Sequence, residues 1–355
     1  MNEAAMTVSP AFPLHADASL PVLPFAAVRP AIIGMAQEHE LPVIQDSAVS
    51  VIVEVPAFGH YSFAAEGGGT AIRISAAMPD RLHMLKEGVA GHLDAFRPGA
   101  SEALRWSDPS VVGALPPNVH FTAVQSVTPV GSTFLRVRVE TPDLVSFQDD
   151  AIHFRLLLPP ASCAVPEWPR VAENGATVWP KGEKALRRPV YTTRWICHEA
   201  GLMEFDIFLH DGGRAAEWAR QAKSGDRLAI AGPGGGGVPE TSKILLYADE
   251  TALPAAARIL ENLPQDSQGE AVLLSEEGEG CGYPVTVPEG IALTWLRRRD
   301  GHSLAGRALA ARKEFPSHFL WFACEKSDVQ HLREALRQDK PAPGQSYIAA
   351  YWSQS

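Results

Sequence analysis

The residues best suited to chemistry stand close together in the stretch RRPVYTTR, which ends at Arg194. It combines an aromatic ring, two adjacent hydroxyls and several arginines. In a strand, Tyr191 and Thr193 face one way, and Thr192 and Arg194 face the other. A tyrosine can lie flat on a ring system, and a threonine hydroxyl can hydrogen-bond a ring nitrogen. An arginine can form a bidentate pair with a pyrophosphate. A polar surface strand explains the same residues equally well.

A second stretch, FLHDGGRAAEWA, has the pattern of a strand, a turn and a helix. The strand is expected to end at His210, the turn to use Gly212 and Gly213, and the helix to begin near Arg214. Glycines before a helix leave its first backbone N–H groups open to a phosphate. A simple connection also uses glycines. The position just after the arginine-rich strand favours the phosphate site.

Two other glycine-rich or acidic stretches are weaker signals. The run AGPGGGG, residues 231–237, lacks the Gly-Lys-Ser/Thr of a phosphate-binding loop, so we interpret it as a flexible hinge between domains. The stretch ADET, residues 248–251, follows an apolar strand. It is typical of a capped helix start, and a ligand contact is the alternative.

Three segments with different patterns must position these residues. In the first, which ends near residue 110, we expect residues 1–20 to be a flexible tail. A small α+β unit follows, with helices expected over 25–40 and 79–96 and strands over 50–55, 60–66 and 70–76. The second helix carries an apolar stripe made of Leu82, Leu85, Val89, Leu93 and Phe96. That stripe predicts one face packed on the strands.

The second and third segments predict a β-barrel and a nucleotide-binding sheet. Residues 115–238 alternate short strands with turn residues, which is typical of an antiparallel barrel. A polar loop, residues 160–184, interrupts them. Residues 242–355 repeat strand, turn and helix, which predicts an open parallel sheet that binds ligands at its carboxyl edge. The predicted fold class is therefore α/β with a β-barrel.

The composition narrows the classes of partner and site. The formal net charge is -10, which disfavours nonspecific binding to nucleic acid or to anionic membranes. The four cysteines form no C-x-x-C pair, so we expect buried thiols in a reducing cytoplasm. We find no signal peptide, no membrane span and no histidine spacing that suits a metal. These histidines are interpreted as surface or helix-face residues: His39, His60, His83 and His92.

Six stretches, in this order, resemble the siderophore-interacting protein family: RRPVYTTR, FLHDGGRAAEWA, GDRLAIAGP, YADETALPAAARILE, WFACEKSDVQHLREALR and YIAAYW. That family consists of FAD-dependent ferric-siderophore reductases related to the ferredoxin reductases. The resemblance covers about residues 115–352. The first segment, which ends in HLDAFRPGASEALRW, resembles a small domain of unknown function that is sometimes fused in front of such reductases.

The resemblance implies which residues hold the cofactors, FAD and NADPH or NADH. Tyr191 would stack on the isoalloxazine, Thr192 would approach its N5, and Arg194 would neutralise the pyrophosphate. The other implied cofactor-binding residues are Arg188, Thr193, His210, Gly212, Gly213 and Ala215 near the flavin, and Asp249, Glu250, Thr251, Ala252 and Glu325 at the nicotinamide-facing strand ends. Pro189 stands where the family commonly has an arginine.

The implied substrate is a ferric siderophore or another ferric chelate, and a ferredoxin is a further candidate partner. Arg155 keeps a cation that the family often places near the flavin, whereas Gly234 and Ser353 stand where two others are usual. Arg297 and Arg299 belong to a cation cluster that suits a siderophore or a 2′-phosphate, although such a run is more often a solvated face.

The resemblance also implies the chemistry and leaves alternatives. Hydride from NAD(P)H reaches the flavin, and single electrons then pass to Fe(III), which hard oxygen donors hold much more tightly than Fe(II). No catalytic residue is assigned, because the flavin carries the reaction. The alternatives are a flavin reductase for another acceptor and a non-catalytic siderophore-binding module.

Overall fold

The structure is a computed structural model of the chain. It describes residues 11–39, 41–108, 112–161, 163, 165–210, 212–337, 341–342 and 344–353. The chain forms two compact units, which are described separately. The first, called here the N-terminal unit, comprises Met1–Val119 together with Pro159–Arg187. The second comprises His120–Leu158 and Arg188–Ser355 and contains both the barrel and the nucleotide-type sheet.

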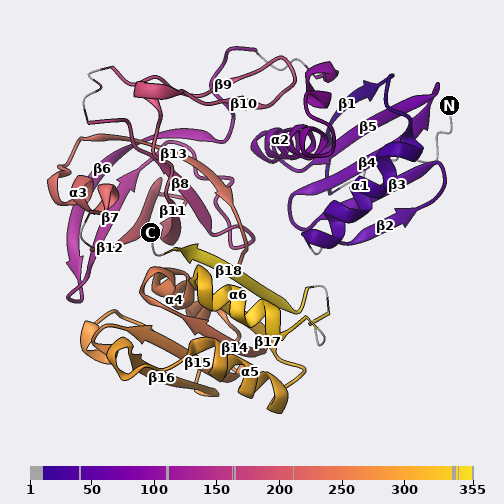
Figure 1. Ribbon diagram of the computed structural model, residues 1–355. Coiled ribbons are helices and arrows are strands. Elements are labelled where there is room, and N and C mark those ends of the chain that lie inside the picture. Colours follow the sequence, from indigo (N-terminus) through magenta and orange to yellow (C-terminus); the bar gives the residue numbers. More distant parts are fainter. Residues whose placement is uncertain are drawn as a thin grey trace. The chain divides into compact units, whose positions relative to one another are not determined.

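The N-terminal unit is built on a five-stranded antiparallel sheet (Figure 1). Its order is β1-β5-β4-β3-β2, with bounds Leu14–Leu20, Gly69–Ala76, Gly59–Glu66, Ser50–Val55 and Val43–Asp46. Two helices, α1 (Phe25–Glu38) and α2 (Pro79–Phe96), pack against it. The predicted strands and helices of this unit are confirmed, and α1 accommodates Pro30 within its length.

Residues 1–20 were expected to be a flexible tail, and for residues 14–20 this prediction is wrong. Residues 14–20 form β1, which pairs along its whole length with β5. Ala16 and Leu20 are fully buried, so this strand has an inward face made of small and aliphatic side chains. Residues 1–10 lie outside the described residues.

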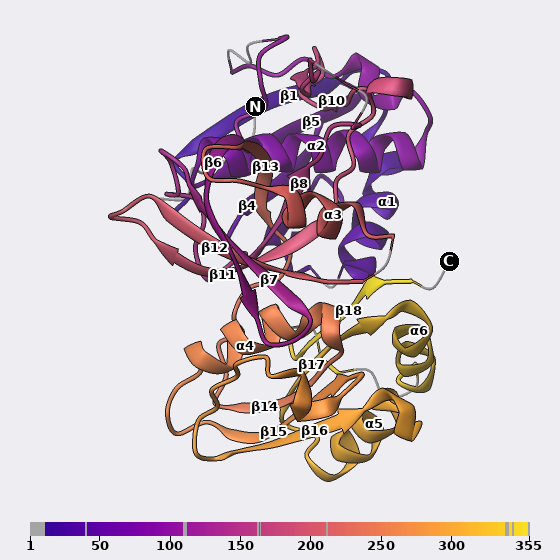
Figure 2. The same cartoon turned by 90° about the vertical axis from the view of Figure 1, so that its left-hand side faces the viewer.

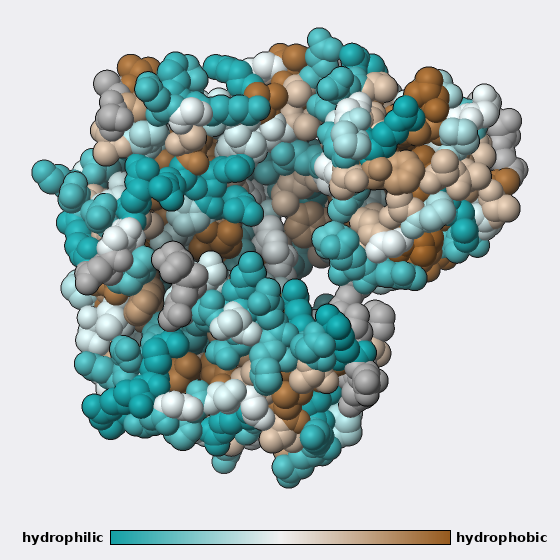
Figure 3. Space-filling view, viewed as in Figure 1, coloured by the Kyte–Doolittle hydropathy of each residue, from teal (hydrophilic) through white to brown (hydrophobic). Residues whose placement is uncertain are grey.

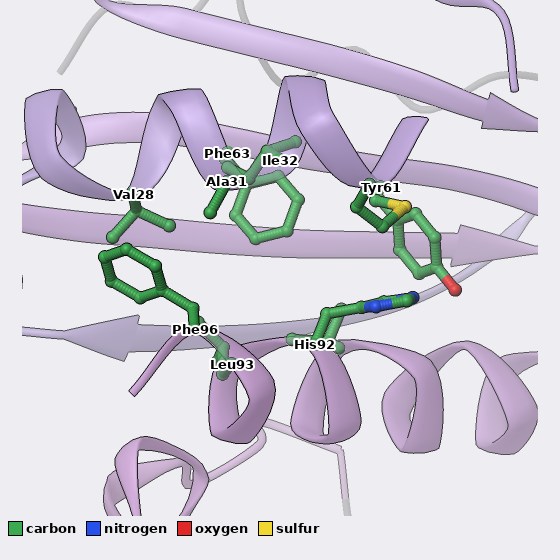
Figure 4. Close-up of a pocket in the computed structure, with 10 residues that line it drawn as sticks. Val28, Ala31, Ile32, Tyr61, Phe63, His92, Leu93 and Phe96 are labelled. Atoms are coloured by element: carbon green, nitrogen blue, oxygen red, sulfur yellow. The ribbon is translucent and has the colours of Figure 1, made fainter. Parts of the chain in front are cut away.

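The apolar core of this unit lies between its two helices and β4 (Figure 4). Val28 and Ile32 of α1 and Leu93 of α2 face Phe63, and Tyr61 and His92 lie at one end of the same gap. The remaining gap is about 30 Å³, the volume of roughly one water molecule. The predicted apolar stripe of α2 therefore packs as expected, and only Phe96 at its end is largely exposed.

The second unit begins with a closed six-stranded barrel of order β11-β12-β7-β6-β13-β8 (Figures 1 and 2). In chain order the strands are β6 (Val119–Val130), β7 (Phe134–Glu140), β8 (His153–Leu157), β11 (Val190–Cys197), β12 (Leu202–Phe208) and β13 (Arg227–Gly234), with α3 (Arg214–Gln221) between the last two. Phe154, Phe205 and Ile207 fill its interior. The predicted barrel is confirmed.

A five-stranded parallel sheet follows, in the order β16-β15-β14-β17-β18. The strands are β14 (Lys243–Ala248), β15 (Gln268–Ser275), β16 (Ile291–Arg297), β17 (Phe319–Glu325) and β18 (Ser346–Trp352). α4 (Leu253–Asn262) covers one face, and α5 (Leu304–Glu314) and α6 (Lys326–Ala335) cover the other. Residues of β14 are buried on both faces, which explains its continuous apolar run.

The glycine run between barrel and sheet is closely packed and not a loose hinge. A Cβ at Gly235 would lie 2.7 Å from the His153 ring, and one at Gly236 would lie 2.6 Å from the Tyr347 ring. A Cβ at Gly237 would meet the backbone of Asp149 and Asp150. Glycine is therefore required here because the backbone approaches its neighbours closely.

The surface is partly polar and partly apolar, and the two kinds of side chain are distributed unevenly over the two units. Figure 3 shows mainly hydrophilic side chains over α5 and α6, the two helices on the outer face of the sheet. Exposed large apolar side chains occur more often in the N-terminal unit, where they include Val22, Val43, Ile44, Val49 and Phe96. None of the described helices is both long and apolar enough to span a membrane.

Candidate flavin and nucleotide site

Strand β11 presents its two faces as the alternation predicts. Tyr191 packs beside Phe205 with ring centroids 5.9 Å apart, and the Thr193 hydroxyl contacts the Met203 sulfur at 3.6 Å. Both contacts lie on the barrel side of the strand. Thr192 contacts His153 of β8, and Arg194 contacts Glu261 of α4.

His153 of β8 joins β11 to β18. Its Nδ1 lies 3.2 Å from the Thr192 hydroxyl, and its Nε2 lies 3.0 Å from the Tyr351 hydroxyl. The imidazole is buried, and burial, together with repulsion from Arg258, lowers its pKa to about 4. The ring is therefore neutral at pH 7, so one of its nitrogens accepts a hydrogen bond and the other donates one.

Two arginines fasten β11 to α4. Arg194 forms a bidentate ion pair with Glu261 of α4, with N–O distances of 2.6 and 2.5 Å. Arg258, also on α4, donates to the Thr193 carbonyl and to the Asp149 carboxylate, the latter at 2.8 Å. The ion pair uses two of the guanidinium nitrogens, and the buried Nε of Arg194 has no hydrogen-bond partner among the described residues. Its pyrophosphate role stays a prediction.

The carboxyl end of β14 is covered by the aromatic end of β18. The Asp249 carboxylate accepts from the Thr251 amide at 3.0 Å, from its hydroxyl at 2.7 Å and from the Trp352 indole at 2.6 Å. Burial is the main reason that the pKa of Asp249 is raised. Glu250 pairs with Arg298, whose guanidinium lies 6.0 Å from the centre of the Trp352 ring. The helix-capping interpretation of ADET is confirmed. The capping residue Asp249 also belongs to a buried polar cluster with Thr251 and Trp352.

The two other residues predicted to contact the nicotinamide nucleotide, Glu325 and Ala252, have structural roles. Glu325 caps α6, because its carboxylate accepts from the Ser327 amide at 2.5 Å. Ala252 is fully buried at the start of α4. Their proposed contact with the nucleotide stays a prediction.

The start of α3 has the features of an anion site. Gly212 has a φ of +73°, and a Cβ at Gly213 would lie 2.7 Å from the His210 ring. Among the described residues no side chain caps the first turn, so these side chains leave its N–H groups open to an anion. Ala215 is buried in that turn, and Asp211 lies outside the described residues.

The three predicted substrate cations are exposed. Arg155 of β8 donates to the Arg188 carbonyl at 3.1 Å, just before β11 begins. Arg297 and Arg299 lie at the carboxyl end of β16, an edge strand of the parallel sheet. Their role in binding the substrate stays a prediction.

Sequence reasoning missed several residues that hold this site together. They are His153, Arg258, Glu261, Arg298, Tyr351 and Trp352. One signal was available, because YIAAYW places two large aromatic residues at the end of the chain without an evident core to fill. The partners of the two α4 residues are far away in sequence, and no local pattern marks them.

A closed barrel joined to a parallel nucleotide-type sheet defines a reductase-like architecture. Residues 123–237 match the siderophore-interacting FAD-binding domain family, and residues 241–355 match the siderophore-interacting protein family. The chain belongs to the siderophore-interacting protein family.

Similar proteins support this placement. The chain is 33% identical to the NADPH-dependent ferric-chelate reductase of Escherichia coli, over 56% of this chain and 78% of that protein. It is 26% identical to the ferric vibriobactin reductase ViuB of Vibrio cholerae, over 63% and 85% of the two chains. A siderophore utilization protein from T. fusca superposes with a TM-score of 0.58 and 29% identity, covering 67% of this chain and 93% of that one.

The residues of the barrel fit an FAD. The first turn of α3, which no described side chain caps, offers N–H groups to a pyrophosphate. The Thr192 hydroxyl offers a buried hydrogen-bonding group on the strand predicted to lie along the flavin. Among the described residues, no group of three His, Cys, Asp or Glu could hold a metal ion.

Proposed function

We propose that this protein is an FAD-dependent reductase that uses NADPH to reduce ferric siderophores and so releases Fe(II). One observation carries the proposal. Arg258 of α4 donates to the Thr193 carbonyl of β11, so the predicted flavin strand is bonded to the helix that begins at the nucleotide edge of the sheet. This hydrogen bond supports an electron-transfer site shared by the barrel and the sheet, which belong to one compact unit.

When bound, FAD would supply a hydride acceptor for the nicotinamide and a single-electron donor for the ferric chelate. The chain's own residues bind and orient. The neutral His153 holds the Thr192 hydroxyl in place, and Tyr351 closes the other side of the imidazole. The aromatic end of β18 also excludes water from the carboxyl end of β14, because Trp352 covers Asp249. On the substrate side, Arg155 provides an exposed positive charge for an anionic ferric chelate.

The choice of NADPH follows from the name of the Escherichia coli relative, and NADH is the alternative. A ferredoxin is a further candidate electron partner. All four cysteines are free thiols, which supports action in the reducing cytoplasm. The absence of cations at Gly234 and Ser353 favours a less highly charged chelate than a tris-catecholate and keeps another acceptor open.

The test is an anaerobic titration of the purified protein. We expect a yellow protein that bleaches with NADPH more readily than with NADH or reduced ferredoxin, and whose colour returns when a ferric siderophore is added. Fe(II) is then trapped by a colorimetric chelator. A colourless protein that does not take up FAD would overturn the proposal. Bound FAD without nicotinamide oxidation would instead favour a non-catalytic binding module.

A further inference from the structure

A loop from the barrel belongs structurally to the N-terminal unit. Residues 159–187 connect β8 to β11, the two adjacent strands that carry Arg155, His153 and the predicted flavin-binding residues. The Leu156 amide donates to the Pro189 carbonyl at 3.0 Å, so the two strands are paired up to the point where the loop leaves them. The loop itself makes its contacts within the N-terminal unit.

The loop docks on a polar face of α2. Its short strands β9 (Arg170–Val171) and β10 (Thr177–Val178) form a hairpin, and Thr177 meets two α2 side chains. The Thr177 hydroxyl lies 2.9 Å from the His83 Nε2, and the Thr177 amide donates to the Glu87 carboxylate at 3.2 Å. His83 and Lys86 are both buried, although they are polar residues of the helix.

The tip of the hairpin is held more closely still. The Trp106 indole donates to the Asn174 carbonyl at 2.7 Å, and the Asn174 side chain donates to the buried Ser101 hydroxyl at 3.2 Å. Gly175 has a φ of +79°, and a Cβ there would lie 2.8 Å from the Trp106 ring and 3.2 Å from the Lys86 side chain. The tip therefore fits a surface of the N-terminal unit that leaves no space for a side chain.

Polar residues of an amphipathic helix ordinarily face water. Here a hydrogen-bonded loop buries polar residues of α2. The apolar stripe of α2 already packs without this loop, so we look for another role of the contact. We propose that the N-terminal unit is an anchor for the loop 159–187, and that by holding this loop it fixes the ends of β8 and β11, where Arg155 receives the ferric chelate. The substrate part of this inference rests on the proposed function.

Two glycines of the same loop give a matched test. Gly175→Ala introduces a Cβ against Trp106 at a left-handed backbone position. Gly182→Ala introduces one at φ +61° with no atom within 4 Å, so it carries similar backbone strain without the clash. Hydrogen exchange of residues 165–180 reports on docking. The FAD dissociation constant and the KM and kcat for a ferric siderophore report on the site.

We expect Gly175→Ala to speed exchange of the loop amides at least tenfold and to raise KM for the chelate at least fivefold, with kcat within twofold of wild type. Gly182→Ala should match wild type in both. Should Gly175→Ala fail to fold, Trp106→Phe removes the hydrogen bond to Asn174 and keeps the ring, and the same changes are expected.

Three outcomes would overturn the anchor: an undocked loop with unchanged KM and FAD affinity, unchanged exchange in Gly175→Ala, or equal effects in both glycine variants. If the wild-type protein binds FAD but reduces no ferric chelate, the proposed function fails separately. The anchor is then judged by loop exchange and by the FAD dissociation constant, which should rise at least threefold in Gly175→Ala only.

Discussion

At the scale of single residues, the alternation of side chains along a strand predicted the direction in which they point better than the residues that they contact. It placed Tyr191 and Thr193 on one face of β11, and both contact residues of the barrel core. It could not predict that Arg194 pairs with Glu261, 67 residues further along the chain, because a tertiary ion pair leaves no local pattern. The same limit hid His153, whose two partners are 39 and 198 residues away.

The ion pair between Arg194 and Glu261 allows two roles of the arginine to be tested separately: binding the FAD pyrophosphate and joining β11 to α4. If Arg194 binds the FAD pyrophosphate, Arg194→Ala should weaken FAD retention at least fivefold, whereas Glu261→Ala should leave it unchanged or improve it by freeing the guanidinium. Equilibrium dialysis of flavin measures this. Wild-type flavin occupancy in Arg194→Ala would show that the residue only joins β11 to α4.

The Thr192 hydroxyl offers a second test at this scale. Thr192→Val keeps the shape of the side chain and removes its hydrogen bond with His153. A lost hydrogen bond of about 1.4 kcal/mol corresponds to a rate effect of about tenfold, so we expect flavin reduction by NADPH to slow by about that factor with FAD occupancy retained. Stopped-flow absorbance measures the rate. Thr192→Ser should recover most of it, and equal rates in all three proteins would remove the hydroxyl from the mechanism.

At the scale of elements, the sequence predicted strands and helices wherever apolar periodicity was strong. It missed β1, because the inward face there includes an alanine and the strand lies in a polar terminal stretch. The closely packed glycine run looked flexible because nothing in a sequence shows how near another backbone comes. The loop 159–187 was predicted as part of the barrel segment, since covalent order does not reveal the unit in which a loop makes its contacts.

The last strand, β18, should contribute to both stability and the nucleotide site. Trp352→Phe keeps an aromatic ring and removes the indole donor to Asp249, which then keeps only its Thr251 contacts. An under-satisfied buried carboxylate costs about 1–3 kcal/mol, so we expect the free energy of unfolding to fall by about that amount. Urea denaturation measures it.

A matched control for that variant lies in the same sheet. Trp295→Phe changes a partly buried tryptophan of β16 that packs against the α4-side core. We expect it to leave the KM for NADPH unchanged, whereas Trp352→Phe should raise that KM several-fold. Equal KM values in the two variants would show that the end of β18 serves packing alone.

At the scale of the whole molecule, buried and partly buried histidines with a lowered pKa couple stability to pH. Burial is the main cause that lowers the pKa of His83, His92 and His318, as well as that of His153. A base whose pKa is lower in the folded state binds protons preferentially when unfolded. Stability is therefore lost as pH falls below the unfolded value of about 6.5. Asp249 acts in the opposite sense, because its pKa is raised in the folded protein.

His153 isolates the histidine contribution from these opposing groups. With a folded pKa of about 4, its linkage alone should lower the free energy of unfolding by about 2 kcal/mol between pH 7 and pH 5. We expect His153→Gln to be less stable than wild type at pH 7, because its hydrogen bonds to Thr192 and Tyr351 are altered, but to lose correspondingly less stability on acidification. Replacing the exposed His302 by glutamine should retain the wild-type slope. Urea titrations at pH 5, 6 and 7 measure the three slopes. If His153→Gln and wild type have the same slope, the imidazole is not held neutral, and its place as a hydrogen-bonding bridge between Thr192 and Tyr351 would need a different protonation state.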